Sequence, residues 1–140
     1  MKIDYKIRPD RYGSHVYSAM LNVQLSLPLP NSPRTKKFEA LIDSGAARSL
    51  FHADVGRYLG LDVQMGDLER LQGVAGPSDS WVHRVRLYAF GSPHEIYAGF
   101  KEDLPIAGLL GMNGFFDHFL ATFIHPALAC EIERIRDGQA

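Results

Sequence analysis

The sequence predicts a single all-β domain, and three observations lead to this fold class. Several short runs place apolar residues at every second position, which is typical of half-buried strands. Turns rich in glycine and proline separate these runs, and helical periodicity is scarce. The 140 residues, 46% of them hydrophobic, suffice for one modest core. Many short strands with marked turns therefore favour an all-β domain.

The strongest strand signal covers residues 17–29, where every odd position is apolar and most even positions are polar. A proline-rich segment at residues 28–37 reads as a loop that joins two strands. The remaining strands are predicted at residues 38–42, 81–90, 95–100, 120–125 and 127–135.

Helix is predicted in two short places only. We expect one short helix near residues 113–119, in the C-terminal third, and a helical turn near 53–59 that Gly60 ends. Residues 1–13 are expected to form an N-terminal arm or edge strand, residues 14–135 the domain itself, and residues 136–140 a disordered tail.

Composition excludes several classes of function. The formal net charge of −1 offers no electrostatic footprint for nucleic acid or an anionic membrane. The single cysteine, Cys130, allows no internal disulfide, and none of the six histidines forms an HExxH pattern, so no metal or cofactor is expected. The sequence shows no signal peptide and no apolar run near the ~18 residues of a membrane span. We therefore expect a soluble, cytoplasmic protein.

An acidic residue stands at the end of an apolar strand. The run Phe38–Ile42 stops at Asp43, and the small residues Ser44, Gly45 and Ala46 follow. Asp, Ser and Gly are common turn formers, so a surface Asx-turn is the simplest interpretation. A carboxylate emerging from a buried strand is nevertheless costly unless it is paired or protonated, and small neighbours permit a ligand to approach the backbone.

The segment "ALIDSGAARSLF" resembles the active-site loop of the retropepsin-like aspartic proteases, a family of single-domain, homodimeric enzymes. The family pattern is two apolar residues, Asp, Thr or Ser, Gly and Ala, with a further Ser or Thr that Ser49 supplies here. "GLLGMNGF", with Leu109, Leu110 and Gly111, is similar to the family's later apolar-Gly element. "LQGVAGPSDSW" resembles its flap hairpin, with Gly73, Val74, Ala75 and Gly76 at the tip.

The resemblance implies a retropepsin-like acid-protease half-barrel that hydrolyses peptide bonds with Asp43 as the catalytic acid. Ser44 would hydrogen-bond across a dyad, Gly45 would present its carbonyl to the substrate backbone, and the flap would close over an extended peptide. Peptide hydrolysis without a metal or a covalent intermediate needs one carboxylate to activate water and one carboxylic acid to protonate the carbonyl. The chain contains no second Asp-Ser-Gly or Asp-Thr-Gly, so we expect a C2 homodimer in which two Asp43 side chains meet.

The sequence also departs from the family pattern. Retroviral members carry acidic residues just after the active-site block and an arginine after the later glycine, and these pair; Ala47, Arg48 and Met112 stand there in this chain. One alternative is therefore a catalytically silent retropepsin-like module for dimerisation or peptide binding. Another is an unrelated β-barrel binding protein with a chance Asp-Ser-Gly.

Overall fold

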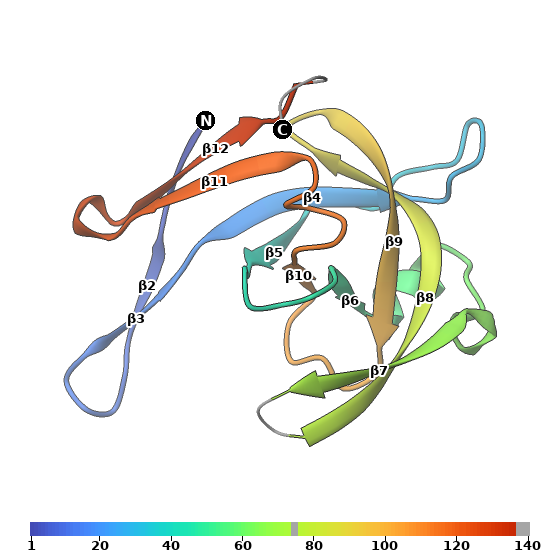
Figure 1. Ribbon diagram of the computed structural model, residues 1–140, viewed down its shortest axis with the longest axis horizontal. Helices are drawn as coiled ribbons and strands as arrows, with labels where there is room; N and C mark the ends of the chain where they lie inside the picture. The colour runs from blue at the N-terminus through green and yellow to red at the C-terminus, as the bar shows by residue number, and fades with distance from the viewer. Residues whose placement is uncertain (74–75, 137–140) are drawn as a thin grey trace.

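The computed structural model describes residues 1–73 and 76–136, and these form an all-β fold (Figure 1). The strands are β1 (Lys2–Asp4), β2 (Lys6–Pro9), β3 (His15–Ser18), β4 (Met20–Ser26), β5 (Phe38–Ile42), β6 (Leu50–His52), β7 (Asp67–Gly73), β8 (Gly76–Ala89), β9 (Ser92–Lys101), β10 (Gly108–Leu110), β11 (Phe119–Ile124) and β12 (Ala129–Arg134). The helical segments are α1 (Ala53–Tyr58) and the 3₁₀ turns η1 (Val63–Met65) and η2 (His125–Ala127). The predicted fold class is confirmed.

Seven strands form the main sheet in the order β4-β5-β10-β6-β9-β8-β7. β4 also pairs with β8, with Leu25 opposite Leu87, so the sheet closes on itself and β7 extends from the closed part through β8 alone. Figure 1 shows the resulting hairpin of β7 and β8 at the bottom of the view, away from the barrel. Closure buries one face of every barrel strand and gives the domain its core.

Two smaller sheets complete the fold. β1, β12 and β11 form a three-stranded sheet in that order, with Ile3 opposite Cys130, and β2 pairs with β3 as a separate hairpin. The first residues therefore include strands, one of them at the edge of a sheet. Among the described residues, no helix is long and apolar enough to cross a membrane.

The alternation predicted for residues 17–29 is present, but the segment is divided between β3, which ends at Ser18, and β4, which begins at Met20. Leu21, Val23 and Leu25 are buried on one face of β4. The strand ends at Ser26, and Leu29 is exposed. Pro28 and Pro30 flank Leu29, and proline supplies no N–H for a sheet ladder, so the proline loop begins earlier than the apolar pattern suggests.

The helical turn expected near residues 53–59 is present as α1, Ala53–Tyr58, but the helix expected near residues 113–119 is wrong. His52 Nδ1 accepts a hydrogen bond from the Asp54 N–H (3.0 Å) at the start of α1. In the later segment, Gly114 has φ of +104°, which interrupts helical geometry. The segment therefore forms successive turns, which nevertheless bury Phe115 and Phe119 in the core.

Candidate active site

Asp43 follows directly on β5 and is tied to a strand that is distant in sequence. β5 runs parallel to β10, with Ile42 opposite Leu110, and the Asp43 N–H donates to the Leu110 carbonyl (2.9 Å). The Asp43 side chain is half-buried at this point. The two segments that the sequence singled out, 43–46 and 109–111, are thus brought together by the tertiary fold.

The carboxyl of Asp43 is oriented by the turn that follows it. The Gly45 N–H donates to Asp43 Oδ1 (2.9 Å), and the Ala46 N–H donates to the Asp43 carbonyl (3.2 Å). Ser44 and Gly45 are exposed at the tip of this turn. The Asx-turn expected from residue preferences is therefore present. Because this turn leaves the Asp43 carboxyl accessible, it is compatible with a chemical role for Asp43.

Gly111 lies against the backbone of residues 43–49, the candidate active-site loop. A Cβ at Gly111 would lie 2.7 Å from the Ala46 carbonyl oxygen and 2.8 Å from backbone atoms of Arg48. The Met112 N–H donates to the Ala46 carbonyl (2.8 Å). The hydroxyl of Ser49, which is fully buried, accepts from the Gly111 N–H (3.0 Å). These contacts fix the loop beneath Asp43.

The remaining predicted site residues are divided between the flap and β10. Gly73 and Gly76 face each other in the β7–β8 register at the end of the hairpin. Val74 and Ala75 lie outside the described residues. Leu109 is half-buried between Leu41 on β5 and Leu50 on β6.

Comparisons with known proteins agree with this geometry. A family model described as aspartyl protease matches residues 31–113, which include the active-site loop, the flap strands and Gly111. The chain belongs to the aspartyl protease family. No curated protein sequence matches it significantly.

Two solved structures show the same retropepsin-like fold as this family member. A retropepsin-like aspartic protease from Rickettsia conorii is similar with a TM-score of 0.59 and 18% identity, over 95% of this chain and 98% of that one. EIAV protease complexed with the inhibitor HBY-793 has a TM-score of 0.51 and 18% identity, over 67% of this chain and 81% of that one.

A pocket of about 460 Å³ adjoins Asp43 in this aspartyl protease-family chain and was not predicted from the sequence. The rings of Tyr17 and His125 meet edge to face with centroids 4.9 Å apart, and Tyr5 packs beside both. The lining residues come from four separate parts of the chain: Tyr5, Tyr17, Ser18, Ala19, Leu41, Ile42, Asp43, Phe123 and His125. No local sequence pattern connects them, so only the fold reveals the pocket.

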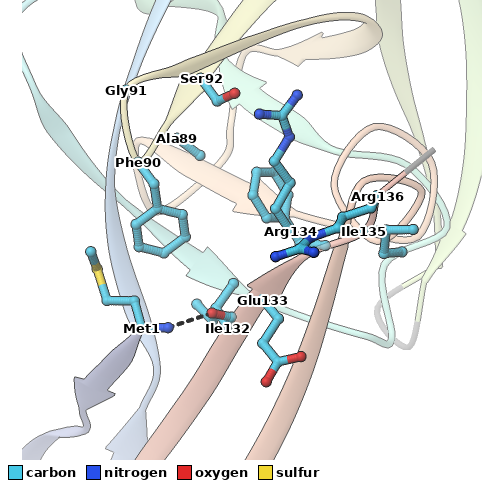
Figure 2. A pocket seen from close by; sticks show the side chains of 11 residues that line it. Met1, Ala89, Phe90, Gly91, Ser92, Ile132, Glu133, Arg134, Ile135 and Arg136 are labelled. Carbon is cyan, nitrogen blue, oxygen red and sulfur yellow. Dashed lines mark hydrogen bonds between the residues drawn. The ribbon is translucent and has the colours of Figure 1, made fainter. Parts of the chain in front are cut away.

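A larger pocket, of about 910 Å³, shares no lining residue with the one at Asp43 (Figure 2). It lies between the β8–β9 turn and the end of β12, where Arg134 and Glu133 line it. The Met1 amino group donates to the Ile132 carbonyl (2.7 Å) at its edge. None of the predicted site residues lines this pocket.

Arg48 was noted in the sequence only as a departure from the retroviral pattern, yet it has a defined partner. Its Nε and Nη2 donate to the two carboxylate oxygens of Glu69 on β7 (2.8 and 3.2 Å). Its Nη1 donates to the Tyr97 carbonyl on β9 (3.0 Å). Cys130, by contrast, is fully buried, and burial raises the pKa of its thiol, which disfavours a nucleophilic role.

Proposed function

We propose that this protein is an aspartic endopeptidase that hydrolyses peptide bonds as a homodimer. The observation that carries the proposal is the position of Asp43: a half-buried acid at the end of β5, oriented by the Gly45 N–H and supported from below by Gly111. Membership of the aspartyl protease family supports the same reaction class.

Two chains supply the two carboxyl groups that the reaction needs. The Asp-Ser-Gly sequence at residues 43–45 occurs once in the chain. In a C2 dimer each chain contributes one Asp43, and two close carboxyls share a single proton because like charges disfavour the doubly ionised form. The ionised acid takes a proton from water, and the protonated acid donates to the substrate carbonyl as the water oxygen attacks the carbon.

We infer that an extended peptide binds between the active-site loop and the β7–β8 hairpin. Main-chain groups at a strand edge bind peptides by sheet-like hydrogen bonds, which are independent of side-chain identity. Gly45, exposed beside Asp43, offers its carbonyl to such a peptide without side-chain obstruction. The hairpin of β7 and β8 would cover the peptide from the opposite side, and no cofactor is needed for this chemistry.

The second chain is expected to dock at the pocket beside Asp43. Among the described strands β11 pairs only with β12, which leaves its other edge available. Leu120 and Phe123 on β11 are 55% and 45% exposed, and Phe123 lines the same pocket as Asp43. Exposed apolar residues on an edge strand favour pairing with another chain, and here that chain also brings the missing acid.

Replacement of Asp43 by Asn tests the proposal. The amide is nearly isosteric, cannot act as a base and carries no charge, so we expect hydrolysis of a peptide library to be lost while the circular dichroism spectrum is retained. Asp62→Asn, at an exposed acid in front of η1, is the matched control and should cleave like the parent.

Two results would contradict the proposal. Cleavage by Asp43→Asn at the parent rate would exclude Asp43 as the catalytic acid. Binding of peptides without hydrolysis by the parent protein, at acidic and neutral pH, would instead favour the silent peptide-binding module.

A further inference from the structure

The β7–β8 hairpin has a second attachment besides its ladder with the barrel. β7 is the last strand of the main sheet and pairs only with β8 among the described strands. Figure 1 shows this hairpin extending away from the closed part of the sheet. A two-stranded ribbon is only marginally stable by itself, so contacts with the rest of the domain matter for its order. The distance between the hairpin and Asp43 therefore depends on the contacts at the root of the hairpin, the end near Glu69 where β8 joins the barrel.

Arg48 holds that root through its side chain. The guanidinium forms two parallel hydrogen bonds with the Glu69 carboxylate of β7, while its third donor binds the Tyr97 carbonyl of β9. The side chains of Arg48 and Glu69 are only 19% and 35% exposed. Bidentate, charge-assisted bonds that are partly shielded from water are stronger and more directional than surface ion pairs.

The backbone of Arg48 is fixed as firmly as its side chain. Arg48 forms an isolated bridge with Asn113. On either side of it, the Asn113 N–H donates to the Ala47 carbonyl (3.0 Å) and the Ser49 N–H donates to the Asn113 carbonyl (2.9 Å). These backbone hydrogen bonds hold Arg48 in place within the active-site loop. Its guanidinium therefore links the hairpin to a fixed part of the structure. Glu69 is likewise fixed in the ladder opposite Ser80, which is fully buried.

We propose that Arg48 is a positioning residue that clamps the root of the β7–β8 hairpin to the active-site loop. The clamp sets how the hairpin lies over the peptide bound at Asp43, and in this respect it rests on the proposed function. Loss of the Arg48–Glu69 pair leaves the acid chemistry intact, but it increases the free-energy cost of ordering the hairpin over a bound peptide. The loss then appears in KM rather than in kcat.

The chain provides a matched control on the same two strands. Arg70 Nε donates to Asp79 Oδ1 (3.0 Å), and these two residues are directly opposite each other in the β7–β8 ladder. This ion pair is internal to the hairpin and is more exposed, at 66% for the Arg70 side chain. Arg70→Met likewise removes an arginine that pairs with a hairpin carboxylate, but it does not release the hairpin from the active-site loop.

Hydrogen exchange tests the clamp without any need for hydrolysis. In Arg48→Met and in Glu69→Gln we expect the amides of β7 and of residues 76–82 to exchange about tenfold faster, and those of β4 and β5 to be unchanged. Arg70→Met should leave both sets near the parent rate. The double variant of Arg48 and Glu69 should exchange no faster than either single one, because both remove the same interaction.

Peptide kinetics give the second readout. We expect Arg48→Met to raise KM about tenfold with kcat nearly unchanged, and Arg48→Lys to recover only part of the loss, since an ammonium group cannot make the bidentate contact. Hairpin exchange in Arg48→Met equal to that in Arg70→Met, or equally accelerated exchange throughout β4 and β5, would overturn the clamp. A parent protein that cleaves no peptide would refute the proposed function, while the exchange result would still decide the clamp.

Discussion

Gly111 and Gly45 show how single residues shape the site in two different ways. A side chain on Gly111 would collide with backbone atoms of Ala46 and Arg48, which have no freedom to yield. A side chain on Gly45 would meet only Asp43 Oδ1, at 3.1 Å, and that carboxyl can rotate. The first glycine is therefore required by the fold, and the second by the orientation of the acid.

Alanine substitutions separate these two roles. Gly111→Ala should lower the free energy of unfolding by about 1–3 kcal/mol, because an added carbon in a tight contact forces the backbone apart. Gly45→Ala should lose less than about 1 kcal/mol but should lower peptide hydrolysis, since the carboxyl of Asp43 is displaced. Urea unfolding and initial rates measure both effects. Equal loss of stability in the two variants would contradict the distinction.

At the scale of elements, a half-buried histidine of β9, His94, packs against the turns before β11. The ring of His94 on β9 stacks on His118 with centroids 4.4 Å apart and meets Phe119 edge to face. His94 Nε2 is buried and has no hydrogen-bond partner among the described residues. Burial first, and then the positive charges of His118 and Arg134, hold the pKa of His94 below its ordinary value of 6.5.

This lowered pKa predicts that the fold loses stability in acid. As the pH falls through about 6.5, the unfolded chain takes up a proton at His94 while the folded chain still resists it, so protonation favours unfolding. We expect the urea midpoint to fall between pH 7.5 and 5.5, and His94→Phe to reduce that fall by removing the titrating group from an aromatic site. His15→Phe, at an exposed histidine of β3, should keep the slope of the parent. An unchanged slope in His94→Phe would contradict the prediction.

At the scale of the whole molecule, the proposed reaction depends on how two copies meet. Under the proposal, the second copy docks at the edge of β11 that is unpaired among the described strands and at the pocket lined by both Phe123 and Asp43. β1 already pairs with β12 of its own chain, so it occupies the opposite side of this small sheet. Pairing of two copies through β11 would leave the β1–β12 pairing within each chain intact.

A charge placed on β11 tests this interface. Phe123→Arg brings two like charges to the surface where the copies meet, so we expect the dimer dissociation constant to rise at least about tenfold. Tyr58→Arg, on the exposed side of α1, should dimerise like the parent. Sedimentation velocity over a concentration series measures both. A parent that stays monomeric at every concentration, or a Phe123→Arg variant that dimerises normally, would contradict docking at β11.

The sequence alone determined the fold class, the strands β4, β5, β8, β9, β11 and β12 and the candidate acid, because these depend on local patterns, whereas the strands β6, β7 and β10 were not predicted. Period-two apolarity sets strands such as β4, and Asp-Ser-Gly after an apolar run marks the turn at Asp43 irrespective of distant contacts. The sequence also predicted the helical turn that forms α1, but the helix it predicted at residues 113–119 is absent, since the positive φ of Gly114 outweighs the apolar pattern around it.

Only the tertiary structure decided what surrounds the acid. The contact of Gly111 with Ala46, the pairing of Arg48 with Glu69 and the pocket that joins Phe123 to Asp43 each unite residues far apart in the chain. Their individual sequence neighbourhoods look like ordinary strand or turn segments. The pairing of β5 with β10 brings Gly111 to the loop after Asp43, and such long-range pairing depends on the summed burial of the whole core rather than on any one motif.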